Sequence, residues 1–238
     1  MKNPEVLLKI DKKADIKNAL LFIKYNPKDN LRFIRWFLPK KLHHILDKRY
    51  SQKERNKIIK KYTNDIFSKR EEEIKEATIK SQADWKLVKK RYFNLINKIF
   101  KKHPWPKGKY TGFTSVFCMY PRDIKEKTFS FPFFHATPRF SNIVIAHELL
   151  HFIFFDYIKN KYGLQENSKI NSKKNNYVWQ ISEVFNSVIE NWEPYYKIFK
   201  IKTLKQKPYT GREYFLQMKK QWEKKQDIDY LLDQWFIK

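Results

Sequence analysis

Residues 143–155 of the chain read IVIAHELLHFIFF, and this stretch carries both a strong helical pattern and a clear chemical motif. A helix, expected over about residues 142–157, would be apolar on nearly all sides and therefore buried. Three polar side chains interrupt the stretch 143–155: His147, Glu148 and His151. Burying two imidazoles and a carboxylate is costly without partners. These three residues therefore need a compensating group inside the fold.

The spacing of the two histidines indicates that this group is a metal ion. His147 and His151 are four residues apart, so they share one helical face with Cβ atoms about 5–6 Å apart. Their imidazole nitrogens can converge on one Zn²⁺ at about 2.0–2.1 Å. Glu148 lies about 100° further round the helix, beside the metal, where it can take a proton from a water molecule. The motif predicts a zinc site with Glu148 as the catalytic base.

The distribution of charge supports a cation site and indicates that a second stretch of the chain lies near it. Although 51 of the 238 residues are Lys or Arg, neither occurs in residues 140–158 or 175–196. A cation site requires that ammonium groups be kept away from it. The charged residues of the two stretches are all acidic: Glu148, Asp156, Glu183, Glu190 and Glu193.

A third metal ligand follows by elimination. A catalytic zinc site uses three protein ligands, and no histidine follows His151, so a downstream carboxylate is expected. The helix expected over residues 177–192 offers Glu183 and Glu190, both opposite its apolar stripe. We favour Glu183 and keep Glu190 as the alternative. Two polar neighbours could orient the Glu183 carboxylate: Ser182 and Asn186.

The motif HELLH at 147–151, followed on a separate helix by SEVFN at 182–186, resembles the gluzincin group of zincin metallopeptidases. The resemblance covers about residues 110–195. It implies that Glu183 completes the zinc site and that a strand before the motif helix binds a peptide substrate. One common gluzincin pattern has Asp four residues after the ligand Glu, where this chain has Ser187. The spacing from Glu to Asn is also similar to that of the ImmA/IrrE-type regulatory peptidases.

The patterns elsewhere predict an α+β fold that is mainly helical, with a small β-sheet packed on the motif helix. Residues 1–103 are expected to form a basic helical region and residues 104–238 a zincin-like catalytic region. Residues 113–120 and 128–136 are rich in β-branched and aromatic side chains, which is typical of strands. Pro132 cannot donate a ladder hydrogen bond, so its strand is expected at a sheet edge.

Further helices are expected where apolar residues recur at spacings of three and four. In the basic region these helices are predicted over residues 31–38, 51–80 and 85–99. After residue 192 we expect one or two more helices, with three large apolar side chains on one face: Phe215, Met218 and Trp222.

The net charge of +26 has a compositional explanation. The basic residues are mainly Lys, they are spread along the whole chain, and they accompany abundant Asn, Ile, Phe and Tyr. All of these have A/T-rich codons, so nucleic-acid binding is not favoured as the origin of the charge. Two alternatives remain, a basic nucleic-acid-binding module with a structural zinc site and a regulatory peptidase acting on nucleic-acid-bound proteins. A structural site needs a fourth ligand, for which His135 is a candidate.

The cysteine content and the lack of long apolar runs limit the classes of protein to which the chain could belong. Cys118 is the single cysteine, which excludes an intramolecular disulfide and a structural zinc site built from cysteines. No apolar leader segment and no run of about 18 apolar residues occurs, so we expect a cytoplasmic protein without a membrane partner. The expected partner is a peptide or protein substrate. Candidate donors to the oxyanion, none of them preferred, are His135, Tyr177, Tyr195 and Tyr196.

Overall fold

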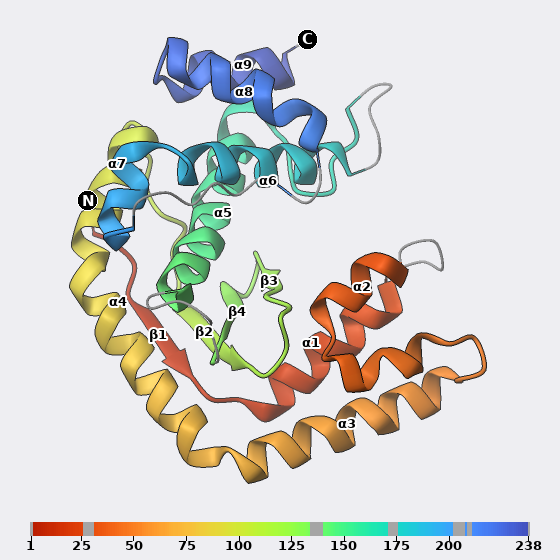
Figure 1. The fold of residues 1–238 in the computed structure, drawn as a ribbon. Coiled ribbons are helices and arrows are strands. Elements are labelled where there is room, and N and C mark those ends of the chain that lie inside the picture. Colours follow the sequence, from red (N-terminus) through yellow and green to blue (C-terminus); the bar gives the residue numbers. More distant parts are fainter. Residues whose placement is uncertain are drawn as a thin grey trace. The chain divides into compact units, whose positions relative to one another are not determined.

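The computed structural model describes residues 2–25, 31–133, 140–170, 176–201, 208 and 211–237. These residues form a mainly helical α+β fold with one four-stranded sheet, which confirms the predicted fold class (Figure 1). None of the helices described is long and apolar enough to cross a membrane. The chain divides into two compact units, each assembled from separated segments. The division predicted after residue 103 stays a prediction.

We call one unit the sheet unit and the other the helical unit. The sheet unit comprises Glu5–Trp85 and Lys109–Ile145. The helical unit comprises Met1–Pro4, Lys86–Gly108 and Ala146–Lys238.

The sheet has the strand order β1-β2-β4-β3. Strand β2 is parallel to both β1 and β4, whereas β3 is antiparallel to β4. The strands are β1 (Val6–Lys9), β2 (Tyr110–Ser115), β3 (Arg122–Asp123) and β4 (Thr128–Pro132). The sequence pattern does not predict β1, because four residues are too few to show alternation and its partner strand is distant in the chain.

Strand β4 lies at a sheet edge only in its second half, since β3 pairs with its first two residues. Ser130 and Pro132 point their backbone groups away from β2. The Ser130 amide donates to the Pro121 carbonyl at 3.0 Å, and the Pro132 carbonyl accepts from the Ser141 hydroxyl at 3.1 Å. Because Pro132 has no amide hydrogen, these two residues offer no free N–H to a peptide. Residues 134–136 of the predicted strand lie outside the described residues.

A side chain closes the opposite edge of the sheet. The Leu8 amide donates to Gln82 Oε1 at 2.8 Å, and Gln82 Nε2 donates to the Val6 carbonyl at 3.4 Å. The Gln82 amide therefore takes the place of a neighbouring strand and blocks further pairing along β1.

Helices pack around the sheet unit's own apolar core. They are α1 (Lys12–Tyr25), α2 (Leu31–Phe37), the 3₁₀ helix η2 (Lys40–Leu46) and α3 (Gln52–Lys69). The buried cluster contains Ala19, Ile23, Ile34, Leu38, Leu42, Ile45, Leu46, Ile59, Phe117 and Met119. The helix predicted over 51–80 is interrupted at Arg70, where α4 (Glu71–Ile99) begins. No Pro or Gly marks this break in the sequence.

The helical unit contains the predicted motif helix. This helix, α5 (Phe140–Tyr162), starts in the sheet unit and belongs to the helical unit from Ala146 onward. The other elements are α6 (Tyr177–Glu190), α7 (Glu193–Tyr196), the 3₁₀ helix η3 (Lys197–Phe199), α8 (Arg212–Lys224) and α9 (Ile228–Phe236). As predicted, α8 buries Phe215, Met218 and Trp222.

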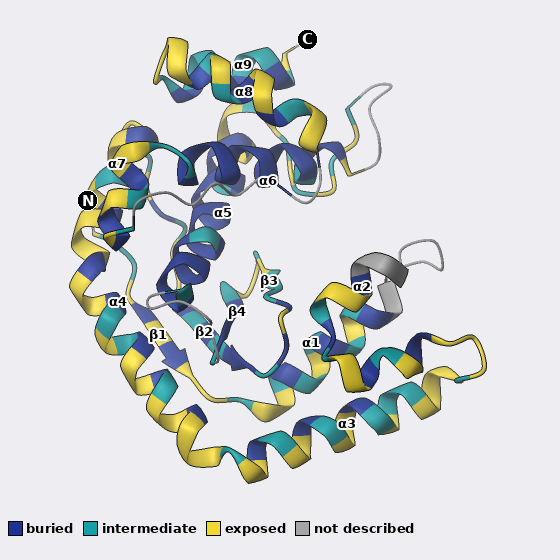
Figure 2. Ribbon diagram, viewed as in Figure 1, coloured by how far each residue is buried: buried dark blue, intermediate teal, exposed yellow. Residues whose placement is uncertain are grey.

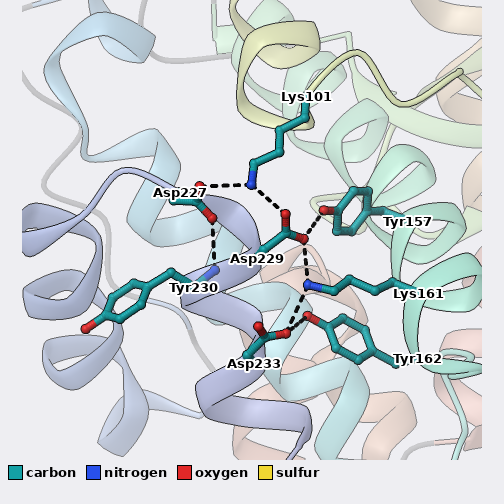
Figure 3. A network of polar contacts seen from close by, with 8 residues as sticks. All are labelled: Lys101, Tyr157, Lys161, Tyr162, Asp227, Asp229, Tyr230 and Asp233. Carbon is teal, nitrogen blue, oxygen red and sulfur yellow. Dashed lines mark hydrogen bonds and ion pairs between the residues drawn. The ribbon is translucent and has the colours of Figure 1, made fainter.

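A glycine before α8 and a polar network at α9 hold the C-terminal helices in the helical unit. Gly211, with φ of 62°, precedes α8, and a Cβ there would lie only 2.9 Å from Val184 on α6. The position therefore needs glycine both for its conformation and for the close approach. A polar network holds helix α9. In it the Asp229 carboxylate accepts hydrogen bonds from Lys101 Nζ, Lys161 Nζ and the Tyr157 hydroxyl (Figure 3).

Candidate metal centre

Helix α5 places the two histidines of the motif on one face. Their ring centroids are 4.8 Å apart, and the two Nε2 atoms approach each other at 3.1 Å. The His151 side chain is fully buried, whereas that of His147 is 23% exposed. The i, i+4 spacing thus brings both rings together as predicted, with one of them reachable from solvent.

Helix α6 contributes a carboxylate to the same point. Glu183 Oε2 lies 3.5 Å from His147 Nε2, and Glu183 Oε1 lies 3.4 Å from His151 Nε2. Residues of α6 are almost all buried, so this glutamate is on no solvated face (Figure 2). A carboxylate buried at 5% exposure beside two imidazoles has the surroundings of a metal ligand rather than of a surface charge.

The ligand atoms of the three groups all lie within 4.8 Å of one another, close enough to hold one metal ion. Ligand atoms at about 2.0–2.1 Å from a tetrahedral ion lie about 3.3–3.4 Å from one another. The two Nε2 atoms are 3.1 Å apart, Glu183 Oε2 lies 3.5 Å from that of His147, and Glu183 Oε1 lies 3.4 Å from that of His151. Two imidazoles and one carboxylate are a donor set that Zn²⁺ accepts. Within the described ranges, His147, His151 and Glu183 are the group of this kind that could hold an ion.

Glu190 contacts His147 from the other side of the ring. Its Oε1 lies 2.8 Å from His147 Nδ1, and its side chain is 2% exposed. Burial would lower the pKa of His147, but the carboxylates of Glu190 and Glu183 outweigh it and hold that pKa well above its usual value. The sequence predicts Glu190 only as an alternative metal ligand. Its spacing of seven residues from Glu183 was the available signal, because it places both on one helical face.

Two side chains fix the α5 backbone at the site. Asn186 Nδ2 donates to the His147 carbonyl at 3.1 Å, and the Tyr92 hydroxyl donates to the Ala146 carbonyl at 2.8 Å. Ser182 donates instead to the Trp179 carbonyl of its own helix at 2.7 Å. The two polar neighbours suggested as orienters of Glu183 therefore make other contacts, and Asn186 instead anchors the backbone of His147.

The structure also gives the positions of the predicted catalytic base and of most candidate oxyanion donors. Glu148 is 5% exposed and lies on α5 between the two histidines. The Tyr177 hydroxyl donates to the Trp235 carbonyl at 3.2 Å, which commits it to α9. Tyr195 is fully buried against the ring of Tyr92, with centroids 6.2 Å apart. His135 lies outside the described residues, and Tyr196 is half-buried.

Comparison of the chain with protein-family models, with curated proteins and with solved structures found no match.

Proposed function

We propose that this protein is a zinc-dependent metallopeptidase in which His147, His151 and Glu183 hold Zn²⁺. The observation that carries the proposal is the pair of imidazole Nε2 atoms 3.1 Å apart beside the buried Glu183 carboxylate, whose two oxygens lie 3.5 and 3.4 Å from them. Three protein ligands leave a fourth position for water or substrate, which is the arrangement of a catalytic site. The partial exposure of His147 provides a side from which a substrate can approach.

The chain's own side chains supply proton transfer and orientation. When bound, zinc supplies an electrophile that polarises a carbonyl group and makes a water molecule more acidic. A carboxylate oxygen of Glu148 accepts the proton of the attacking water and passes it to the leaving amine nitrogen. Glu190 accepts a hydrogen bond from His147 Nδ1–H, which keeps the Nε2 lone pair directed to the metal.

Metal content and hydrolysis, measured on the same variants, test the proposal. We expect about one zinc per chain in the purified protein and almost none in His147→Ala or His151→Ala. Glu148→Gln should keep the zinc and lose cleavage of a peptide mixture followed by mass spectrometry. The matched control is Glu193→Gln, a 60% exposed residue, which should change neither. Full zinc occupancy in the His147/His151 double variant would refute the site, and unchanged hydrolysis by Glu148→Gln would refute the mechanism.

The described residues give less support to a structural zinc site in a nucleic-acid-binding module. Such a site is closed by four protein ligands. The described group offers three, and Glu190 is engaged at the far nitrogen of His147. An open position favours catalysis.

A further inference from the structure

Helix α2 of the sheet unit presents an unusually exposed aromatic side chain. Trp36 is 85% exposed, although tryptophan is generally a well-buried residue type. Exposed Trp is enriched at binding surfaces, where it supplies a large flat contact area.

The segment that carries Trp36 is anchored in the core of the sheet unit. Ile34, Leu38 and Leu42 on the same segment are at most 4% exposed and lie in the core of the sheet unit. The Phe37 carbonyl accepts a hydrogen bond from the Cys118 amide at 3.3 Å. The inner side of the segment is thus committed to the core, and Trp36 projects from a fixed support.

Three basic residues lie close to Trp36 along the chain. Arg35, Lys40 and Lys41 are exposed, and because a residue spans at most about 3.6 Å, they lie within about 18 Å of Trp36. We call these four residues the Trp36 surface. Between residues 31 and 50 the one acidic residue is Asp47, which pairs with Arg49 at 3.0 Å. Neither Arg35 nor Lys40 forms an ion pair with another described residue, whereas Lys41 Nζ lies over the Tyr62 ring, 4.3 Å from its centroid.

We propose that the Trp36 surface binds single-stranded nucleic acid, with a base stacked on the indole and phosphates beside the three cations. An exposed ring flanked by basic groups is what such binding requires, because every base has a π-face. A duplex hides these faces within its stack. A membrane surface would require a broad apolar helix face, and here that face is buried in the core.

The test uses the full-length protein and a fluorescein-labelled oligothymidylate followed by anisotropy at several salt concentrations. We expect Trp36→Ala to weaken binding about tenfold and Trp36→Phe, which keeps a ring, to retain most of the affinity. Removing three phosphate contacts in R35A/K40A/K41A should reduce the slope of log K against log salt by about 2. A duplex of equal length should bind more weakly and respond little to Trp36→Ala.

A matched variant separates a local surface from the overall charge. K86A/K89A/K90A removes the same charge from three exposed lysines of α4 and should leave oligonucleotide affinity within about twofold. Equal losses in the two triple variants, or no loss in Trp36→Ala with circular dichroism unchanged, would overturn the proposal. Trp36-dependent binding to phosphatidylserine vesicles, without oligonucleotide binding, would overturn it in favour of a membrane surface. Zinc content should be the same in all these variants.

Discussion

Two buried glutamates seven residues apart on α6 contact different nitrogens of His147. Glu183 lies near Nε2 and Glu190 lies 2.8 Å from Nδ1. A carboxylate at the far ring nitrogen fixes the orientation of a liganding histidine, and losing it typically costs about 10–100-fold in metal affinity. We expect this loss in Glu190→Ala and a larger one in Glu183→Ala, measured by zinc competition with a chelator.

The control for this comparison is Glu193→Ala, which lies just beyond α6 and pairs with Lys197 on the surface. It should leave zinc affinity unchanged. A greater loss in Glu190→Ala than in Glu183→Ala would exchange the roles assigned to the two carboxylates.

Asp15 lies buried in the sheet unit, where it is 2% exposed. Burial raises its pKa to about 6, although it accepts hydrogen bonds from the Ser115 side chain and the Val116 amide. Because this pKa exceeds the unfolded value of 3.8, the folded protein binds the proton more tightly. The stabilisation is present below about pH 4 and is lost as the pH rises to about 6, which amounts to roughly 2–3 kcal/mol.

Asp15→Asn retains the acceptor oxygen and abolishes the titration. Urea unfolding at several values of pH should therefore show a smaller fall in stability from pH 4 to 6 in the variant than in the wild type. Parallel curves for the two proteins would show that Asp15 does not titrate in this range.

Among helices and strands, the sequence predicts the features that depend on the spacing of residues within one segment. His147 and His151 follow from the i, i+4 rule, and α5 and α6 follow from long apolar patterns. The contact between Glu190 and His147 depends on how two helices approach, which no single segment encodes. Likewise, β1 and the parallel pairing of β2 with β4 join distant segments, and the break at Arg70 has no Pro or Gly to signal it.

Helix α9 is held by a polar network as well as by its buried apolar side chains (Figure 3). Burial acts to raise the pKa of Asp229, but hydrogen bonds from Lys101, Lys161 and Tyr157 outweigh it and place that pKa well below its usual value. This stabilisation is present above about pH 4 and disappears as the pH falls further. Asp229→Asn should lower the free energy of unfolding by about 1–2 kcal/mol at neutral pH, a value limited by the carboxylate's partial exposure.

Hydrogen exchange should locate this loss in α9, with faster exchange for its amides than for those of α6. Glu223→Gln is the matched control, since Glu223 is a 62% exposed carboxylate on α8 that lies 3.7 Å from Lys219. Equal exchange in Asp229→Asn and the wild type would mean that apolar packing alone holds α9.

At the scale of the whole molecule, a net charge of +26 creates repulsion that no single ion pair relieves. Many lysines along α3 and α4 are exposed, so salt reaches them and screens their mutual repulsion. We therefore expect the melting temperature to rise between 50 and 500 mM KCl, by about 2–4 °C for each kcal/mol of repulsion removed. K86A/K89A/K90A, with three positive charges fewer, should show a smaller rise than the wild type under the same conditions. Alanine's helix propensity can raise the melting temperature of this variant at every salt concentration, so the salt dependence is the quantity to compare. A melting temperature that falls with salt would show that surface ion pairs, such as those of Lys75 with Glu71 and Glu72, outweigh the repulsion.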